Sequence, residues 1–161
     1  MPGKIFIAVG THPMQFNRLL EGIDELIGDK KLSGNIFAQT GYSTYKPKHY
    51  KYSKFLDFGA FKKRMKSADL IITHGGEGVI GTALQLNKKM IIVPRLKKFN
   101  EHTNNHQLEL TKAVANSGNA IAVYDIADLE NAFKKINKIK LKQTAHAKGI
   151  IRIIEGFFNE S

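Results

Sequence analysis

The stretch DLIITHGGEGVIGTALQLNKKMIIVPR, residues 69–95, decides the fold class of this chain. It opens with an apolar run that ends in a glycine-rich turn, 69–76, which predicts a buried strand. Residues from about 77 to 86 are expected to form a helix, and a second apolar run follows at 88–95. Strand, helix and strand in this order predict two parallel strands joined by a helical crossover.

The same alternation extends over the rest of the chain. Further strands are expected at 4–10, 34–41, 54–59 and 119–124, with 42–53 as a loop. Helices are expected at 14–28, 60–68, 107–118, 125–138 and about 144–159, with Pro13 at the first turn of the first helix and the last helix amphipathic. The sequence therefore predicts an α/β fold with a single domain over residues 1–161, built on a Rossmann-like doubly wound parallel sheet.

Composition excludes several classes of protein. The chain has 161 residues and no cysteine, so it contains neither disulfides nor thiolate metal sites. No apolar run approaches the roughly 20 residues that cross a bilayer. The start, MPGKIFIAVG, is interrupted by Gly10 and suits a first strand better than a signal peptide. These features favour a cytoplasmic protein.

The charge balance indicates the chemistry of the partners. A formal net charge of +11 favours anions such as nucleic acids, acidic lipid headgroups or phosphorylated substrates. The basic residues are spread over 46–66, 88–98 and 134–152. Charge alone therefore indicates a class of partners, and a solvated surface is the alternative interpretation.

The glycine-rich turn is the first candidate for chemistry. Gly75, Gly76 and Gly78 allow the backbone to approach a ligand, and the helix that follows offers unpaired N–H groups and a positive dipole end. This arrangement suits a diphosphate and requires no metal ion. The alternative is that the glycines only form a tight turn between strand and helix.

Two nucleotide-binding motifs are absent. The dinucleotide fingerprint G-x-G-x-x-G would follow an early strand, where this chain has GTHPMQ. A Walker A loop requires G-K-[ST], which does not occur. The sequence therefore predicts neither a dinucleotide enzyme nor an ATPase, and no cofactor is expected.

The loop after the strand at 88–95 carries the densest group of polar side chains. These are Glu101, His102, Asn104, Asn105, His106 and Gln107, and Arg95 precedes them. Amides and imidazoles suit sugar hydroxyls and phosphate oxygens, and the Arg95 guanidinium suits a phosphate.

Two other interpretations of this loop remain open. His102 and His106 are four residues apart and would share a helix face, as in a zinc site. Thr103 stands where H-E-x-x-H requires glutamate, and no third ligand is evident. Alternatively, Asn104 or Asn105 caps the next helix and the histidines are solvated.

The loop VGTHPMQFN, after the first strand, contributes His12. A histidine at the carboxyl end of a strand contacts ligand or acts as a general base. We regard His12 as the best candidate for the catalytic base on this chain. A plain surface histidine is the alternative.

Four segments together resemble one enzyme family: VGTHPMQFNRLL, DLIITHGGEGVIGTAL, KKMIIVPR and NEHTNNHQLEL. They are similar to the C-terminal, donor-binding half of the GT-B glycosyltransferases of family 28. The similarity is greatest to stand-alone versions of that half, namely the soluble subunit of the split eukaryotic N-acetylglucosaminyltransferase and bacterial exopolysaccharide subunits of the PssE type. It covers roughly residues 3–120.

The resemblance implies an inverting, metal-independent transfer of a sugar from a UDP-sugar to a lipid-linked (polyprenyl) acceptor. The donor would contact residues from all three loops: Gly10, Thr11, His74, Gly75, Gly76, Gly78, Arg95, Glu101, His102, Asn105, His106 and Gln107. Because a GT-B enzyme has two such domains, the resemblance implies a membrane-anchored partner that supplies the acceptor-binding half. The chain would then lie at the inner face of the membrane through that partner, and no nucleic acid is expected.

One position departs from the family pattern. Family 28 enzymes usually have a glutamate that holds the ribose, and Gly81 occupies that place here.

Two functions of other classes stay open. One is a non-catalytic, nucleotide-binding regulatory subunit. The other is a basic nucleic-acid-binding α/β domain, for which YSTYKPKHYKYSKF offers lysines between aromatics but no recognition helix or RNP motif accompanies them.

Overall fold

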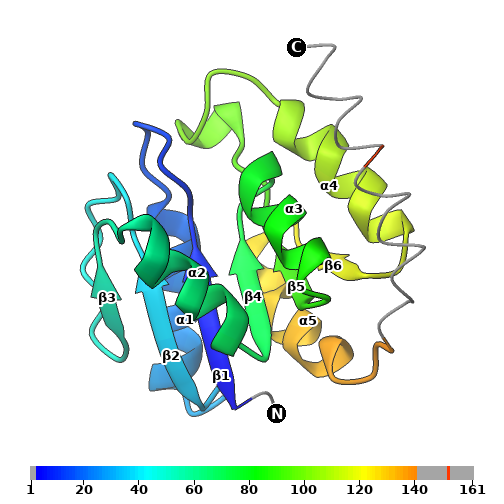
Figure 1. Cartoon of the computed structure of the whole chain (residues 1–161). Coiled ribbons are helices and arrows are strands. Elements are labelled where there is room, and N and C mark those ends of the chain that lie inside the picture. Colours follow the sequence, from blue (N-terminus) through cyan, green and yellow to red (C-terminus); the bar gives the residue numbers. More distant parts are fainter. Residues whose placement is uncertain (1–2, 141–151, 153–161) are drawn as a thin grey trace.

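Six parallel strands form one sheet in the computed structural model, which describes residues 3–140 and 152 (Figure 1). The strands are β1 (Lys4–Ala8), β2 (Asn35–Gln39), β3 (Lys51–Ser53), β4 (Leu70–Thr73), β5 (Lys89–Ile92) and β6 (Ala120–Ala122). Their order in the sheet is β3-β2-β1-β4-β5-β6. The chain therefore moves outward in one direction from β1 and in the other from β4, which is the doubly wound topology expected.

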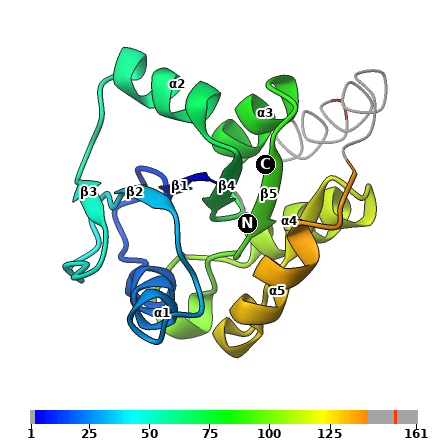
Figure 2. The ribbon, with the colours of Figure 1, turned by 90° about the horizontal axis from the view of Figure 1, so that it is seen from below.

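Helices cover both faces of the sheet. They are α1 (Asn17–Gly28), α2 (Phe58–Ser67), α3 (Glu77–Gln85), α4 (His106–Asn116) and α5 (Leu129–Ile136), with short 3-10 turns η1 (Lys97–Phe99) and η2 (Ile126–Asp128). Helices α1 and α5 lie on one face, and α2 and α3 on the other (Figure 2). Helix α4 packs beside β6 and joins the core of the second face.

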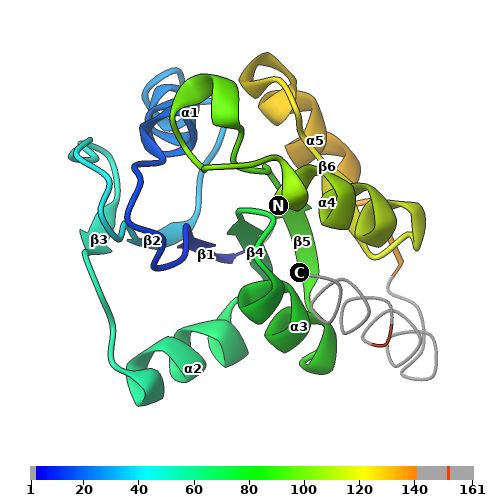
Figure 3. The same cartoon turned by 90° about the horizontal axis from the view of Figure 1, so that it is seen from above.

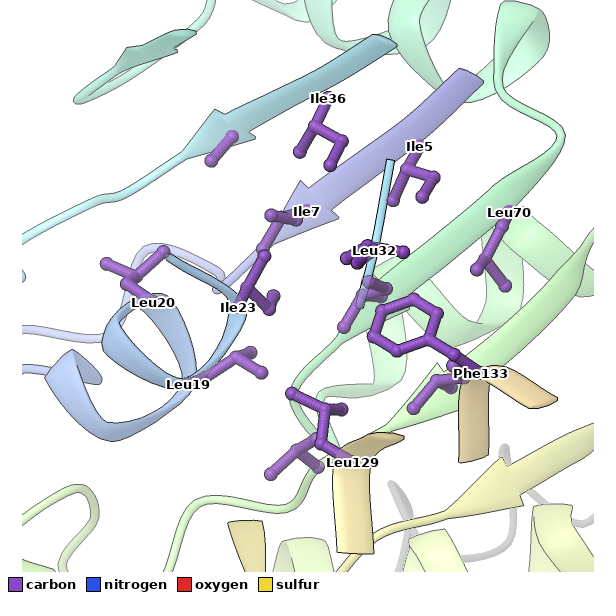
Figure 4. Packing of buried hydrophobic residues seen from close by; sticks show 14 of the residues in the cluster. Ile5, Ile7, Leu19, Leu20, Ile23, Leu32, Ile36, Leu70, Leu129 and Phe133 are labelled. Carbon is purple, nitrogen blue, oxygen red and sulfur yellow. The ribbon is translucent and has the colours of Figure 1, made fainter. Parts of the chain in front are cut away.

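The two cores follow from the alternation of side chains along the strands. Ile5 and Ile7 of β1 point toward α1 and α5, whereas Phe6 and Ala8 point toward the other face. Figure 4 shows Ile5 and Ile7 over Leu19, Leu20 and Ile23 of α1, with Leu129 and Phe133 of α5 closing the cluster. Because both faces are covered, the central strands are continuous apolar runs.

The strand predicted at 54–59 is wrong, since the third strand is β3, inside the segment predicted to be a loop. β3 pairs with β2, from Phe37 opposite Lys51 to Gln39 opposite Ser53. The Asp57 carboxylate accepts a hydrogen bond from Ala60 N and begins α2 at Phe58. The apolar residues of the predicted strand therefore lead into a helix instead.

The first helix begins later than predicted. α1 starts at Asn17, so Pro13 lies outside its first turn. The carbonyls of Met14 and Gln15 accept hydrogen bonds from the Arg95 guanidinium, so they are not free to start a helix. A distant side chain thus sets this boundary.

The amphipathic helix predicted at about 144–159 lies outside the described residues, apart from Arg152, which is helical. Among the described residues, no helix has the length and apolar character needed to span a bilayer.

Phe133 tests the packing of α5. Its side chain is buried in the cluster with α1 and β1, so we expect Phe133→Ala to lower the free energy of unfolding by about 3–5 kcal/mol. Phe58 is 79% exposed on α2 and is the matched control, for which we expect a change below about 0.5 kcal/mol. Urea denaturation of both variants measures the difference. Equal losses would contradict the observed packing.

Candidate functional site

Three loops meet at the carboxyl ends of β1, β4 and β5. The loops are 9–16 after β1, 74–76 after β4 and 93–105 after β5, and they lie together when the molecule is viewed from above the sheet (Figure 3). β1 and β4 are adjacent strands whose connections leave in opposite directions, so a crevice opens between their loops. The three loops singled out in the sequence therefore form one region.

His74 lies at the centre of this region between two glycines. A Cβ atom on Gly10 would come 2.4 Å from His74 Nε2, and one on Gly76 would come 2.0 Å from Cε1. Both distances are far shorter than a van der Waals contact, so only glycine fits on either side of the ring. Gly10 also has a φ of +80°, which glycine adopts without strain. These two glycines therefore hold the imidazole in place.

Gln107, the second residue of α4, fixes the protonation of His74. Its Oε1 accepts a hydrogen bond from Arg95 N at 3.2 Å and lies 3.3 Å from His74 Nδ1. Because a carbonyl oxygen only accepts, Nδ1 donates and Nε2 is left as an acceptor. Burial lowers the pKa of His74 to about 3, and the charge of Arg95 acts in the same direction. His74 is therefore a neutral imidazole at physiological pH.

Two cavities lie on either side of the glycine turn. One has a volume of about 260 Å³ and is lined by Gly75, Gly76, Glu77, His102, Asn104, His106, Gln107 and Leu110. The other has a volume of about 790 Å³ and is lined by Gly10, Thr11, His12, Gln39, Leu56, Phe58, Phe61, His74, Gly76, Glu77, Gly78, Val79, Thr82 and Gln107. Gly76, Glu77 and Gln107 border both, so the start of α3 lies between the two cavities.

The start of α3 suits an anion. Gly76 is the N-cap residue and no side chain caps the helix, so the N–H groups of the first turn are not bound by a capping group. The positive end of the helix dipole adds to their attraction for negative charge. Gly78 is exposed, and a Cβ placed on it would meet no atom within 4 Å. The backbone here is open to a ligand.

Arg95 does not have the position expected for a phosphate ligand. Its side chain is 0% exposed, and its guanidinium donates to four backbone carbonyls, those of Val9, Met14, Gln15 and Glu101. The physical reason is that four loop carbonyls are oriented inward and require a buried donor. Arg95 therefore shapes the site from beneath.

Glu101 is likewise buried and was expected at the ligand. Its carboxylate forms a two-pronged ion pair with Arg18 of α1, with both N–O distances at 3.0 Å. It also accepts a hydrogen bond from Leu96 N. Because both oxygens are occupied, Glu101 positions the loop after β5 instead of facing the cavities.

His12 and His102 stack on each other across the two loops. Their ring centroids are 4.3 Å apart with an interplanar angle of 29°. The Nδ1 atom of each ring accepts a backbone N–H, from Met14 in one case and Asn104 in the other. In the neutral rings the proton is therefore on Nε2, so both offer hydrogen-bond donors. Burial is the main cause that lowers the pKa of each ring.

The alternatives for the polar loop are resolved in part by the geometry. The N-cap residue of α4 is Asn105, whose side chain makes no capping hydrogen bond, and the side chain of Asn104 accepts a hydrogen bond from His106 N at the first position of the helix. Asn105 instead accepts from Lys97 N and ties the loop to η1. Among the described residues, no group of three or more His, Cys, Asp or Glu side chains is placed to hold a metal ion.

Several cavity residues were not predicted from the sequence. Gln39, Leu56, Phe58, Phe61, Val79 and Thr82 line the larger cavity. Gly81 does not line the larger cavity, and a Cβ atom on Gly81 would meet no atom within 4 Å. Thr82, the next residue, does line this cavity. The helical phase of α3 could have shown this, because residues 78 and 82 are one turn apart.

The burial of His74 predicts a dependence of stability on pH. The unfolded chain takes up a proton near pH 6.5, whereas the folded chain excludes it until about pH 3. The contribution of His74 to the free energy of unfolding is therefore fully present above pH 6.5. It is lost as the pH falls from 6.5 toward 3, by about 1.4 kcal/mol per pH unit. We expect His74→Gln to remove this part of the acid sensitivity in urea denaturation between about pH 6 and pH 4.

The comparison of slopes isolates His74 because both proteins share every other titrating group. Asp24 also has a lowered pKa, through hydrogen bonds from Tyr45, Lys48 N and His49 that outweigh burial, and it acts equally in both. Parallel slopes in the two proteins would contradict a buried neutral His74.

Comparison with known proteins identifies the family of the chain. Residues 4–155 match the model of the family described as glycosyltransferase family 28 C-terminal domain. The human UDP-N-acetylglucosamine transferase subunit ALG13 is 32% identical over 123 residues, which cover 71% of this chain and 10% of the relative. The mouse protein of the same name is 33% identical over 89 residues, 52% of this chain and 7% of the relative. The chain thus spans about a tenth of the length of these relatives.

Solved structures share the fold at low sequence identity. The kitacinnamycin glycotransferase has a TM-score of 0.65 at 16% identity over 96% of this chain and 39% of that one. MurG of Acinetobacter baumannii has a TM-score of 0.62 at 18% identity over 99% of this chain and 50% of that one. The solution structure of ALG13 has a TM-score of 0.60 at 16% identity and covers 94% of both chains. Fold, family model and relatives agree, and this chain belongs to the glycosyltransferase family 28 C-terminal domains.

Proposed function

We propose that this chain is the donor-binding subunit of a two-component inverting glycosyltransferase that moves a sugar from a UDP-sugar to a lipid-linked acceptor in polysaccharide biosynthesis. The observation that carries the proposal is the uncapped start of α3, which lies between two cavities and beside the neutral ring of His74. Membership in the family gives the reaction class, and this geometry supplies a place for the diphosphate.

The diphosphate lies at the first turn of α3. The N–H groups of this turn and the Nε2–H groups of His12 and His102 donate to its oxygens. Hydrogen bonds to charged groups contribute about 1.5–3 kcal/mol each, so two or three of them reach the roughly 4–8 kcal/mol of millimolar to micromolar binding. No metal ion is required for this affinity.

The base and the sugar occupy the two cavities. Leu56, Phe58 and Phe61 give the larger cavity an apolar wall that suits a flat base, with the amide of Gln39 nearby for a polar edge. The smaller cavity has the carboxylate of Glu77 and the polar side chains of Asn104 and His106, which suit sugar hydroxyls. The name of the human and mouse relatives supports UDP as the nucleotide.

The acceptor half belongs to a second polypeptide in this proposal. The two ALG13 relatives are named as subunits, which supports a partner. A partner domain placed over the carboxyl ends of the strands would close the larger cavity and bring the acceptor to the sugar. A membrane-anchored partner would also hold the chain at the inner membrane face.

Calorimetric titration of the full chain with UDP, ADP and GDP at physiological salt tests the donor site. We expect saturable binding of UDP and much weaker binding of the other two. Equal weak binding of all three would show that the net charge of +11 alone attracts them and would contradict the proposal. Selective UDP binding without transfer by the chain and its partner would assign the non-catalytic regulatory role.

Two glycines of α3 give a matched pair of variants. Gly78 and Gly81 both have open space where an added Cβ would lie, but only Gly78 lines the larger cavity. Alanine should stabilise the helix by about 0.5–1 kcal/mol at either position. We expect Gly78→Ala to weaken UDP binding by about tenfold and Gly81→Ala to leave it unchanged. Equal affinities in the two variants would place the nucleotide elsewhere.

His12 has two candidate roles that a further titration separates. As a donor to the diphosphate, it contributes to UDP affinity, and we expect His12→Ala to weaken binding by about tenfold. As a general base alone, it acts on the acceptor, so UDP affinity would stay unchanged while transfer with the partner falls. The hydrogen bond from Met14 N to Nδ1 favours the donor role.

A further inference from the structure

The edge of the sheet formed by residues 42–67 carries most of the excess charge. We call this segment the basic edge; it contains the edge strand β3 and helix α2, which covers the adjoining face of the sheet (Figures 1 and 3). It has eight Lys or Arg residues and a single acidic residue, Asp57. A charge of +7 out of +11 therefore lies on about a sixth of the chain.

These cations are free to meet a partner. All eight are exposed, and none forms an ion pair with another residue between 3 and 140. The one carboxylate of the basic edge, on Asp57, is used to cap α2. Arg64 lies over the ring of Phe37, with 3.7 Å between its guanidinium carbon and the ring centroid, so the positive charges left for a partner are those of the seven lysines.

Large aromatic side chains are exposed on the same edge. Tyr42, Tyr52, Phe55 and Phe58 are 54%, 38%, 45% and 79% exposed. Phe58 lies at the first position of α2, and the ammonium of Lys62 is 5.9 Å from its ring centroid. Exposed aromatic rings among lysines are the pattern of surfaces that insert rings into a lipid interface while the charges contact headgroups.

We propose that the basic edge binds the surface of an anionic phospholipid bilayer directly, without the partner subunit. Each basic residue near such a surface contributes to binding by electrostatic attraction, and the aromatic rings add apolar burial. This role is separate from the proposed donor site, although Phe58 also lines its larger cavity. A chain bound through this edge would hold the mouth of that cavity close to the membrane.

The arrangement of the rings favours lipid over single-stranded nucleic acid. Nucleic-acid platforms present ring faces on which successive bases stack. Here Tyr42 and Phe55 meet edge to face, with centroids 5.1 Å apart and an interplanar angle of 70°. The edge of one ring therefore covers a face of the other, on which a base would stack. Phe58 is on a helix start, not on the strand that holds Tyr52. The rings therefore form a set of separate projections.

Flotation of the full chain with vesicles of phosphatidylcholine, with or without phosphatidylglycerol, tests this surface in the absence of partner and nucleotide. We expect binding only when phosphatidylglycerol is present. The double variant Lys62→Glu/Lys63→Glu should reduce the partition coefficient by at least roughly thirtyfold, since each basic residue contributes about fivefold. Phe58→Ser should also weaken binding, although it leaves the net charge unchanged.

The matched control is Lys135→Glu/Lys138→Glu, which changes the net charge by the same amount as Lys62→Glu/Lys63→Glu. Both positions are exposed, Lys135 in α5 and Lys138 just after it. This variant should keep most of the binding. Equal losses in both double variants, or no binding to phosphatidylglycerol vesicles, would overturn the proposal. So would base-selective binding of a single-stranded oligonucleotide that only Lys62→Glu/Lys63→Glu removes. UDP binding by Lys62→Glu/Lys63→Glu should be unchanged, so this measurement separates failure of the membrane-binding proposal from failure of the donor-site proposal.

Discussion

The buried guanidinium of Arg95 is the interaction on which the candidate site depends. It lies three residues after the end of β5 and donates to carbonyls from the loop after β1 and from Glu101 in its own loop. Burial lowers its pKa to about 10, so it remains charged at physiological pH. A charge without water must be matched by oriented dipoles, and here the backbone carbonyls supply them. Two loops far apart in sequence are thereby fixed in one arrangement.

The carboxylate of Glu101 completes this framework. It neutralises Arg18 of α1 and accepts the N–H of Leu96, so the loop after β5 is held both to a helix and to itself. Because Arg95 and Glu101 hold the loops from their buried side, the groups on the cavity side of the loops remain available to a ligand. These include the donors of His12 and His102 and the start of α3. The charged residues nearest the sheet thus serve structure, and neutral imidazoles and backbone N–H groups face the cavities.

Charge and site are distributed over different parts of the surface. The proposed diphosphate site uses few full charges, because a helix start and neutral donors suffice to bind an anion. Most of the excess positive charge lies on the basic edge beside it. Phe58 belongs to both surfaces, as it is exposed on α2 and also lines the larger cavity. Apart from this shared ring, the two proposed roles use different residues, so separate substitutions can alter them.

The sequence by itself determined the central strands, because the short apolar runs within 4–10, 69–76 and 88–95 alternate with helical segments, as buried parallel strands do. It also located the glycine turn and the three loops, since parallel strands place their carboxyl ends at one edge. Only the tertiary structure decided which loop residues face the cavities. The sequence shows that Arg95, Glu101 and His102 are polar, but not which of them has a buried partner. Those partners, including the Met14 carbonyl that delays α1, come from contacts between segments about 80 residues apart.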